Sequence, residues 1–402
     1  MAFSFDHHCA VLPALRTDHA AFLRDVAAID PPPLLSALIR VLQAQGEQPV
    51  SPADRRGMVP LAVPLTRNPA TGKLWSPCGL QNRAAHTHPH YGATPASSHV
   101  PFPVFPSRFM QMPVIRVGEG GGCVLVARSA DEYIQRALVE EDVGAREGSA
   151  EGDSGRVGEA AGEEGRRLYS PGDFAAAKAK SLDAYLTTKV CVKPVLCSSA
   201  LSPSLHFQLP HSIFSFVLSL NFHPCVPSPL HEWCWQVGMF PDVLERLALR
   251  HLEQGDQVSA LVAGEFYARK HFPGFAHPFT FNAQLLLRVG RPTEARDAAR
   301  IALKSPWWTL GASYQEVAEL AGYGDSQLEY ALERLTEEGR KEDVNKGKAE
   351  AQVALDQAAF LLDVAAAEGT WDGTREQLAG LYREAGVEEM ASFVLAGPPT
   401  ST

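Results

Sequence analysis

The sequence predicts a mainly α-helical protein, with a solenoid of paired helices on its C-terminal side and a small α+β region before it. Three observations support this fold class. From Gly238 onward, apolar residues recur at three- and four-residue intervals almost without a break. Two stretches in that part share a glycine and an alanine at equal spacing, which is typical of stacked helical units. The N-terminal half contains short β-like runs, two of them joined by a glycine turn.

Two helices are expected near the start of the chain. Residues His19–Ile29 and Pro32–Gly46 both place apolar residues on one helical face. The prolines from Pro31 to Pro33 separate the two segments, and proline suits the first turn of the second helix.

Short strands are expected next, over Met58–Leu65, Met112–Val117 and Cys123–Arg128. The last two runs are joined by "GEGGG" (Gly118–Gly122), which predicts a β-hairpin. A phosphate-binding loop is the alternative for this glycine run. The hairpin is favoured because the run lacks the Gly-Lys-Ser/Thr ending and leads into a strand instead of a helix.

The α+β region, residues 1–143, is expected to end with a helix over Ser129–Val143. Ser129 is its N-cap, and Glu132 completes a capping box. Residues 144–170 are rich in Gly, Glu and Ser, so they predict a polar linker that does not fold by itself. Residues 171–189 resume the helical pattern.

Residues 237–397 contain the repeat. Gly255 is followed by Ala260 and Gly290 by Ala295, at an offset of 35 residues, close to the ~34 of a tetratricopeptide (TPR) unit. Gly386 belongs to a third, off-period copy. A left-handed glycine would end the first helix of each pair, and the alanine would let the paired helices approach closely. The pattern predicts TPR-like helical hairpins, with an irregular α-bundle as the alternative.

Three C-terminal segments resemble a TPR-like protein family of land plants and green algae: "FPDVLERLALRHLEQGDQVSALVAGEFYARKHFPGF", "RVGRPTEARDAARIALKSPWWTLG" and "ALDQAAFLLDVAAAEGTW". "MVPLAVPLTRNPATG" and "ARSADEYIQRALVEED" resemble the N-terminal half of the same family. The resemblance covers most of the chain. It implies association with plastids and supplies no catalytic residues. A chloroplast location is therefore expected, with the cytoplasm as the alternative because no transit peptide is legible.

Two stretches depart from this resemblance. Residues 190–236 separate segments that the family places almost next to each other, and Pro194–His231 contains no Asp, Glu, Lys or Arg. Val190-Cys191-Val192 and Gln236 can be encoded by triplets that resemble intron borders. We therefore interpret residues 190–236 as a translated retained intron, and residues 74–107 as a second non-native or disordered insertion. A native low-charge loop is the alternative.

Composition and charge exclude several classes of partner and of structural feature. The 402 residues carry a net charge of −10, and no stripe of Lys and Arg alternates with aromatic residues, so nucleic acid is not expected. The seven cysteines form no CxxC pair and predict no disulfide framework. The apolar run Ser212–Phe222 is too short to span a membrane.

Two histidine clusters are the candidate metal ligands: His86, His88 and His90 in one, and His7 and His8 beside Cys9 in the other. Zinc sites need about four ligands, usually from two pairs anchored by structure. Neither cluster has a second anchored pair, so no metal is expected. No nucleophile stands in a pattern with a base, and no cofactor or catalytic residue is expected.

Trp307 and Trp308 lie where the second repeat ends. As an exposed pair they could anchor a partner, since Trp is common at binding hot spots. We favour the other interpretation, in which at least one of them covers the end of the helix pair as part of the core.

The sequence thus predicts a non-catalytic scaffold, adaptor or assembly factor that binds an unidentified protein through the concave face of its helices. The alternative is an enzyme or small-ligand-binding protein that uses the β segment around Met112–Arg128. That alternative predicts a concave site there, with convergent polar groups.

Overall fold

The computed structural model describes residues 18–77, 112–118, 121–146, 155–176, 182, 186, 240–269 and 272–396. It is mainly α-helical with a small β region, as the sequence predicts. The insertion at residues 190–236, most of the one at 74–107, and both histidine clusters lie outside the described residues.

Two short helices begin the described chain, α2 (His19–Asp25) and α3 (Leu35–Ala44). The carboxylate of Asp18 caps α2 by accepting hydrogen bonds from the backbone N–H groups of Ala20 and Ala21, at 2.9 and 3.3 Å. Leu38 and Leu42 on α3 are fully buried, because α3 packs between the sheet and the helices that follow it.

An antiparallel sheet has the strand order β1-β2-β3-β4-β5. Its strands are β1 (Gln48–Pro49), β2 (Thr66–Arg67), β3 (Leu74–Pro77), β4 (Val114–Val117) and β5 (Cys123–Ala127). The expected hairpin is present, since Ile115 pairs with Leu125 and Val117 with Cys123. Strand β3 pairs with both β2 and β4. Residues 74–77 therefore belong to the sheet, and the expected insertion does not begin at residue 74.

The prediction of a strand over Met58–Leu65 is wrong, because none of these residues lies in a strand. The segment is irregular and buried, and only the residues after it, in β2, join the sheet. Pro60 and Pro64 explain the difference, because proline has no N–H group to donate to a strand ladder.

Helix α5 (Ala130–Arg146) follows the sheet. The Ser129 hydroxyl accepts a hydrogen bond from the Glu132 N–H at 3.2 Å, as a capping box requires. The Glu132 carboxylate instead reaches back to the N–H of Arg128, at 3.1 Å.

The prediction of an unfolded linker over residues 144–170 is wrong for much of that range. Residues Arg156–Leu168 form helix α6, which packs against α3 and α5, and α7 (Asp173–Ala176) follows. Val157, Ala161 and Gly165 are four residues apart and buried in this packing. Small side chains on one face hid the helical period, because alanine and glycine add little hydrophobicity to the sequence pattern.

The C-terminal part is an array of helices joined by short turns. Its members are α10 (Pro241–Glu253), α11 (Gln257–Ala268), α12 (His277–Arg288), α13 (Pro292–Ala302), the 3₁₀ turn η4 (Trp307–Thr309), α14 (Tyr314–Ala321), α15 (Ser326–Arg334), α16 (Glu337–Asn345), α17 (Glu350–Glu368), α18 (Trp371–Glu384) and α19 (Glu388–Leu395). Helices α10 and α11 pack as one antiparallel pair and α12 and α13 as the next.

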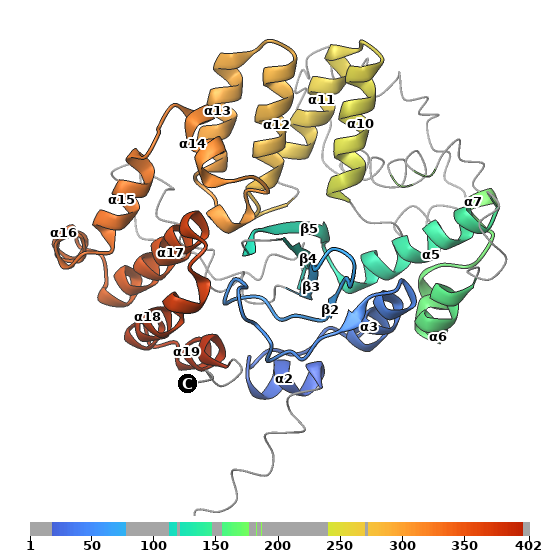
Figure 1. Cartoon of the computed structure of the whole chain (residues 1–402), viewed down its shortest axis with the longest axis horizontal. Helices are drawn as coiled ribbons and strands as arrows, with labels where there is room; N and C mark the ends of the chain where they lie inside the picture. The colour runs from blue at the N-terminus through green and yellow to red at the C-terminus, as the bar shows by residue number, and fades with distance from the viewer. Residues whose placement is uncertain are drawn as a thin grey trace, which may run out of the picture.

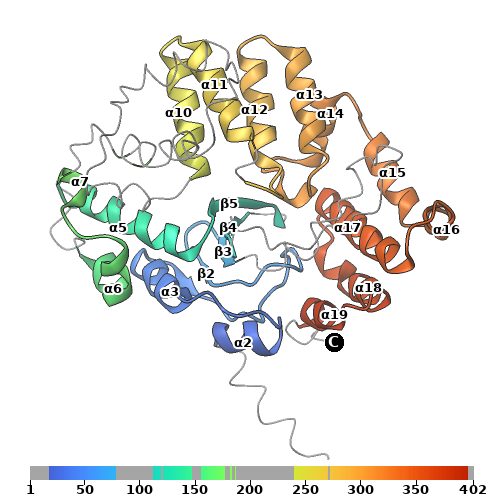
Figure 2. The ribbon, with the colours of Figure 1, turned by 180° about the vertical axis from the view of Figure 1, so that it is seen from behind.

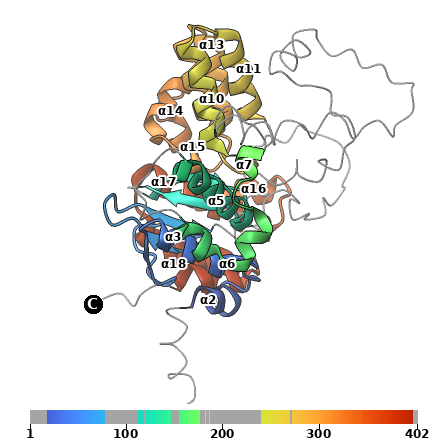
Figure 3. The same cartoon turned by 90° about the vertical axis from the view of Figure 1, so that its right-hand side faces the viewer.

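The array curves around the sheet and returns to the start of the described chain (Figure 1). Seen from behind, α19 lies beside α2 (Figure 2), and Phe393 meets Phe22 edge-on at 6.3 Å between ring centres. Helices α10–α14 stand on one side of the sheet, and α2, α3 and α18 on the other (Figure 3). The inner side of the array, expected to be a free concave face, contacts the chain's own sheet through α10 and η4.

Hydrophobic packing joins the N-terminal region to the array. One core cluster includes Phe22 on α2, Ile115 on β4, Leu244 on α10 and Phe393 on α19. A second, smaller cluster is formed by side chains from α12, α13, η4, α14, α15 and α17. The two expected regions, 1–143 and 237–397, therefore share a core.

Candidate functional site

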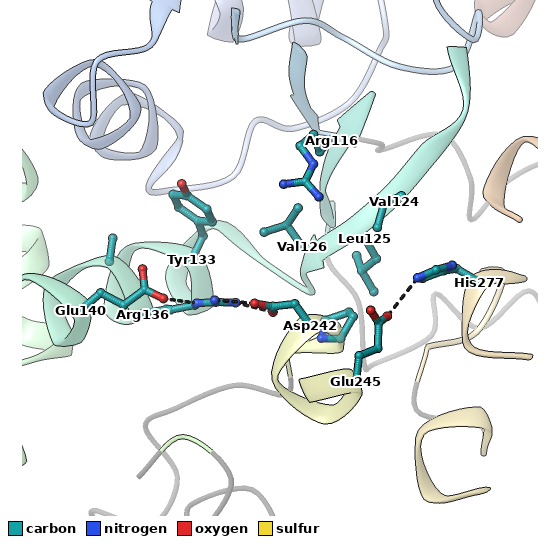
Figure 4. A pocket seen from close by; sticks show the side chains of 12 residues that line it. Arg116, Val124, Leu125, Val126, Tyr133, Arg136, Glu140, Asp242, Glu245 and His277 are labelled. Carbon is teal, nitrogen blue, oxygen red and sulfur yellow. Dashed lines mark hydrogen bonds and ion pairs between the residues drawn. The ribbon is translucent and has the colours of Figure 1, made fainter. Parts of the chain in front are cut away.

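The candidate site is a cavity of about 390 Å³ where the sheet, α5, α10 and the start of α12 meet (Figure 4). It combines apolar side chains from β5 with charged side chains from the surrounding helices. Its lining residues are Arg116, Val124, Leu125, Val126, Tyr133, Arg136, Ala137, Glu140, Pro241, Asp242, Glu245 and His277. The alternative interpretation of the sequence placed a ligand site in this region.

Arg136 forms the first polar cluster of the wall. Its guanidinium donates two parallel hydrogen bonds to Asp242, at 2.6 and 2.7 Å, and a third to Glu140 at 2.7 Å. Arg246 donates to the same Asp242 carboxylate, also at 2.7 Å. The paired bonds from a planar guanidinium hold α10 against α5 with a defined geometry.

The pKa values of this cluster follow from the pairing. Burial alone lowers the pKa of Arg136, but the hydrogen bonds and attraction from Asp242 and Glu140 outweigh burial and raise it. Burial alone raises the pKa of Asp242, and its bonds to Arg136 and Arg246 reverse that effect and lower it. Both groups therefore stay charged at neutral pH.

His277 and Glu245 form the second polar cluster. The Nε2 atom of His277 lies 2.9 Å from Glu245 Oε1, and its Nδ1 atom lies 3.2 Å from the carbonyl oxygen of Leu310. The Tyr267 hydroxyl donates to the same Glu245 oxygen at 2.8 Å. Burial alone lowers the pKa of His277, but these acceptors outweigh burial and raise it. The geometry favours a protonated ring that donates from both nitrogens.

The wall supplies paired carboxylates, and its lining residues supply no nucleophile. Each lining carboxylate accepts hydrogen bonds from a cation of the wall, so none is a free base. Among the lining residues, no Cys, Ser, Thr or Lys side chain offers a nucleophile. The Tyr133 hydroxyl donates to Gln45 at 2.7 Å, and burial raises its pKa. The lining therefore consists of paired carboxylates, their cations, the phenol of Tyr133 and apolar side chains.

Trp307 and Trp308, the candidate anchors, are each 3% exposed. The Trp307 backbone N–H donates to Asp363 at 2.9 Å, and its indole packs against Tyr314 with ring centres 4.2 Å apart. Trp308 belongs to the main core. Both side chains lie inside the array and outside the cavity lining, so they offer no surface to a partner.

The three turn glycines are also remote from the cavity lining. Gly255, Gly290 and Gly386 have φ angles of +80°, +76° and +74°. Each lies between two antiparallel helices, in the left-handed conformation that ends the first helix of a pair. They shape the array and take no part in the candidate site.

The charged lining residues were not among the sequence-based candidates. Arg136 and Asp242 are 106 residues apart, and no spacing in the sequence connects them. The available signal was indirect, because the glycine-joined strands marked the region without identifying the helices that face it. Within the described ranges, no three His, Cys, Asp or Glu side chains converge as a metal site. No helix in those ranges is long and apolar enough to cross a bilayer.

The structure defines a mainly helical fold in which a C-terminal array closes on an N-terminal α+β region. Comparison with protein-family models identifies the family. The PAB N-terminal model matches residues 17–77 and 101–189, the PAB middle domain residues 241–324, and the PAB C-terminal domain residues 328–396. The chain belongs to the PAB family.

One relative is similar along the whole chain. It is the Arabidopsis thaliana protein named "Protein IN CHLOROPLAST ATPASE BIOGENESIS, chloroplastic", which is 39% identical over 395 residues. The match covers 98% of this chain and 96% of the relative. No solved structure matches the chain. The family matches leave residues 78–100 and 190–240 uncovered.

Proposed function

We propose that this protein is a non-catalytic assembly factor of the chloroplast that acts in the biogenesis of the chloroplast ATPase. The observation that carries the proposal is the similarity to the Arabidopsis relative, which extends over nearly the full length of both chains. A match of that extent includes both the N-terminal region and the array, so the relative shares the two regions and their order in the chain.

The geometry supports a binding role for this protein. Each carboxylate of the cavity wall is held by a cation of the wall, so the lining residues present no free base beside a nucleophile. The paired helices α10–α13, which we propose as TPR-like hairpins, supply a rigid support on which such a wall can be presented. The partner of an assembly factor would be an ATPase subunit or an assembly intermediate.

Complementation tests the proposal directly. An Arabidopsis line that lacks the relative would receive this chain behind a plastid-targeting leader, and the assembled chloroplast ATPase would be quantified on native gels. We expect this chain to restore the complex. The relative's own coding sequence is the positive control, and the variant Arg55→Ala, which we expect not to fold stably, is the negative control. Accumulation of the wild-type chain in the plastid without any gain in assembled ATPase would overturn the proposal.

A further inference from the structure

The cavity at the sheet is a bounded space, because the chain itself covers the outer side of β5. Helix α10 and the turn η4 both contact that strand, which leaves no room for another strand beside it. The cavity measures about 390 Å³, and its walls come from β4, β5, α5, α10 and α12. Small-molecule pockets usually measure roughly 300–1,000 Å³. The space therefore suits a compact ligand and not an extended protein segment.

The sheet supplies an apolar wall that is only partly covered. Arg116 on β4 lies directly opposite Val124 on β5, so the two side chains point to the same face of the sheet. Val126 points to that face as well, because side chains two positions apart in a strand lie on one side. Val124 and Val126 are half-buried, and both line the cavity. They leave apolar surface that the hydrocarbon part of a ligand can cover.

Arg116 is the cation that the other charges of the wall leave over. The carboxylates of the wall are each matched by a different cation, in the pairs Glu140–Arg136, Asp242–Arg246 and Glu245–His277. The Arg116 side chain is exposed and points into the space in Figure 4, and among the described residues it makes no hydrogen bond or ion pair. A guanidinium presents its N–H donors in a planar fork, which suits the oxygens of a carboxylate or a phosphate group. The wall therefore offers one positive charge to a ligand.

We propose that this cavity binds a small organic anion, whose carboxylate or phosphate group pairs with Arg116 and whose apolar part rests on Val124 and Val126. The walls come from both the N-terminal region and the array, so the ligand contacts both sides of the junction. Binding therefore stabilises the contact between the two regions. The proposal goes beyond the proposed function and does not depend on it, because it involves no client protein.

Binding of matched small molecules tests this site. Hexanoate and hexyl phosphate carry the two head groups, hexanol is the neutral analogue, and hexylamine is the cationic one. Each would be titrated with the full chain and followed by saturation-transfer NMR of the probe. We expect at least one of the two anions to bind more tightly than hexanol by about tenfold or more, because a charged hydrogen bond to Arg116 is open only to an anion. Hexylamine should bind more weakly than hexanol. The tighter anion identifies the head group as carboxylate or phosphate.

Two substitutions separate the charge from the cavity. Arg116→Gln should lower the affinity for the anion to that for hexanol and leave the affinity for hexanol almost unchanged. Val126→Trp fills much of the cavity and should abolish the binding of every probe. The matched controls are Arg288→Gln, at the far end of α12 from His277, and Val258→Trp, at a valine on α11 that is 73% exposed. Neither control residue lines the cavity, so both variants should bind the anion as the wild type does.

Three outcomes would overturn the anion site. One is the absence of binding by both anions to the wild type. Another is equal affinity for the anions and for hexanol. A third is anion binding that Arg116→Gln leaves unchanged, which would place the anion elsewhere on the protein. Arg116→Gln decides the test even if melting curves show that Val126→Trp does not fold, because it changes an exposed side chain that holds no ion pair among the described residues. None of these results bears on ATPase assembly, which the complementation experiment measures separately.

Discussion

The paired helices α10–α13 and the junctions that close the array are specified in different ways. In the pairs, local residues mark the boundaries: Pro241 and Pro292 occupy first helical positions, and Gly255 and Gly290 stand in the turns. At the junctions, single side chains join distant segments. Arg136 reaches Asp242 across 106 residues, and Arg55 reaches the Phe393 carbonyl across 338 residues.

This difference indicates which residues contribute most to the stability of the fold. Helix pairs follow from a repeated local pattern, and each position contributes a small part. The packing of the array against the N-terminal region depends on a few buried polar and close-packed contacts that no neighbouring residue can replace. We therefore expect changes at the junctions to cost more than comparable changes in the pairs.

The largest effect is expected at Arg55. This side chain is fully buried and donates to the carbonyl oxygens of Pro60, Ala62, Phe393 and Ala396. Arg55→Ala leaves a void and several buried acceptors without a donor, which should lower the free energy of unfolding by roughly 4 kcal/mol. Chemical unfolding followed by circular dichroism measures the loss.

Arg56→Ala is the matched control for this prediction. Arg56 is the next residue, but its side chain is 74% exposed, and its one ion pair among the described residues is with Asp54, at 3.2 Å. Such a surface pair contributes little, so the change should stay within about 0.5 kcal/mol. Equal unfolding midpoints for the Arg55 and Arg56 variants would show that the Arg55 contacts do not stabilise the junction between the N-terminal region and α19.

The next largest effect is expected at Gly121 in the turn between β4 and β5. Its φ angle is +80°, and a Cβ atom placed there would overlap the indole of Trp371. Gly121→Ala combines left-handed strain with overpacking at a junction between the sheet and α18. The sum should be about 3 kcal/mol.

Gly290→Ala separates the two causes. Gly290 has a similar φ angle of +76°, but among the described residues no atom beyond its own chain neighbours lies within 4 Å of the position of an added Cβ. Only the left-handed strain remains, so the expected cost is about 1 kcal/mol. If the two alanine variants unfold at the same denaturant concentration, the contact between Gly121 and Trp371 does not contribute to stability.

Sequence reasoning recovered the parts of the fold that carry a local signal. The α10–α13 pairs and the β4–β5 hairpin lie where the glycine spacing and the "GEGGG" run predicted. It failed where the signal was weak or misleading. The apolar run Met58–Leu65 is buried coil because its prolines cannot donate to a ladder. Helix α6 was missed because its buried face is made of small residues.

The candidate site could not be predicted in the same way. Its wall is assembled from β4, β5, α5, α10 and α12, and its ion pairs join residues with no shared motif. A guanidinium–carboxylate pair depends on the final placement of two helices, which the local sequence does not encode. The expected concave binding face was likewise replaced by intramolecular contacts, because the array curves far enough to enclose its own sheet.

The pair between His277 and Glu245 joins α12 to α10, and its contribution to the free energy of unfolding should depend on pH. The folded state raises the pKa of His277 above its unfolded value. Its contribution is therefore fully present below the unfolded pKa of about 6.5 and is lost as the pH rises through the folded pKa. Urea unfolding from about pH 6 to pH 9 would compare the wild type with His277→Gln. The difference should shrink as the pH rises. A constant difference would show that His277 acts only by packing.

A smaller effect is expected at Glu141, which caps α6 from the neighbouring helix. Its two carboxylate oxygens accept hydrogen bonds from the N–H groups of Val157 and Gly158, at 2.7 and 2.8 Å. Glu141→Ala should cost about 1 kcal/mol, the usual contribution of an N-terminal cap. Glu163→Ala, an exposed change on α6 itself, should cost almost nothing. Hydrogen exchange of the first turn of α6 should increase only in the Glu141 variant.

The smallest effect is expected from removal of residues 190–236. The PAB matches end at residue 189 and resume at residue 241, and Pro194–His231 contains no charged side chain. The junction between α5 and α10 is made by Arg136 and Asp242, which the deletion leaves in place. We expect the free energy of unfolding to change by less than about 0.5 kcal/mol. Soluble yield should rise, because an uncharged stretch rich in aromatic residues favours aggregation.

Deletion of Arg156–Leu168 is the control, because α6 packs on α3 and α5 and its loss should destabilise the protein. Sequencing of the transcript shows independently whether residues 190–236 are encoded in the mature message. A message that contains them, together with a deletion variant that no longer folds, would make the segment native structure. A message that lacks them would explain why the family matches pass over the segment, and why its composition departs so far from that of the flanking helices.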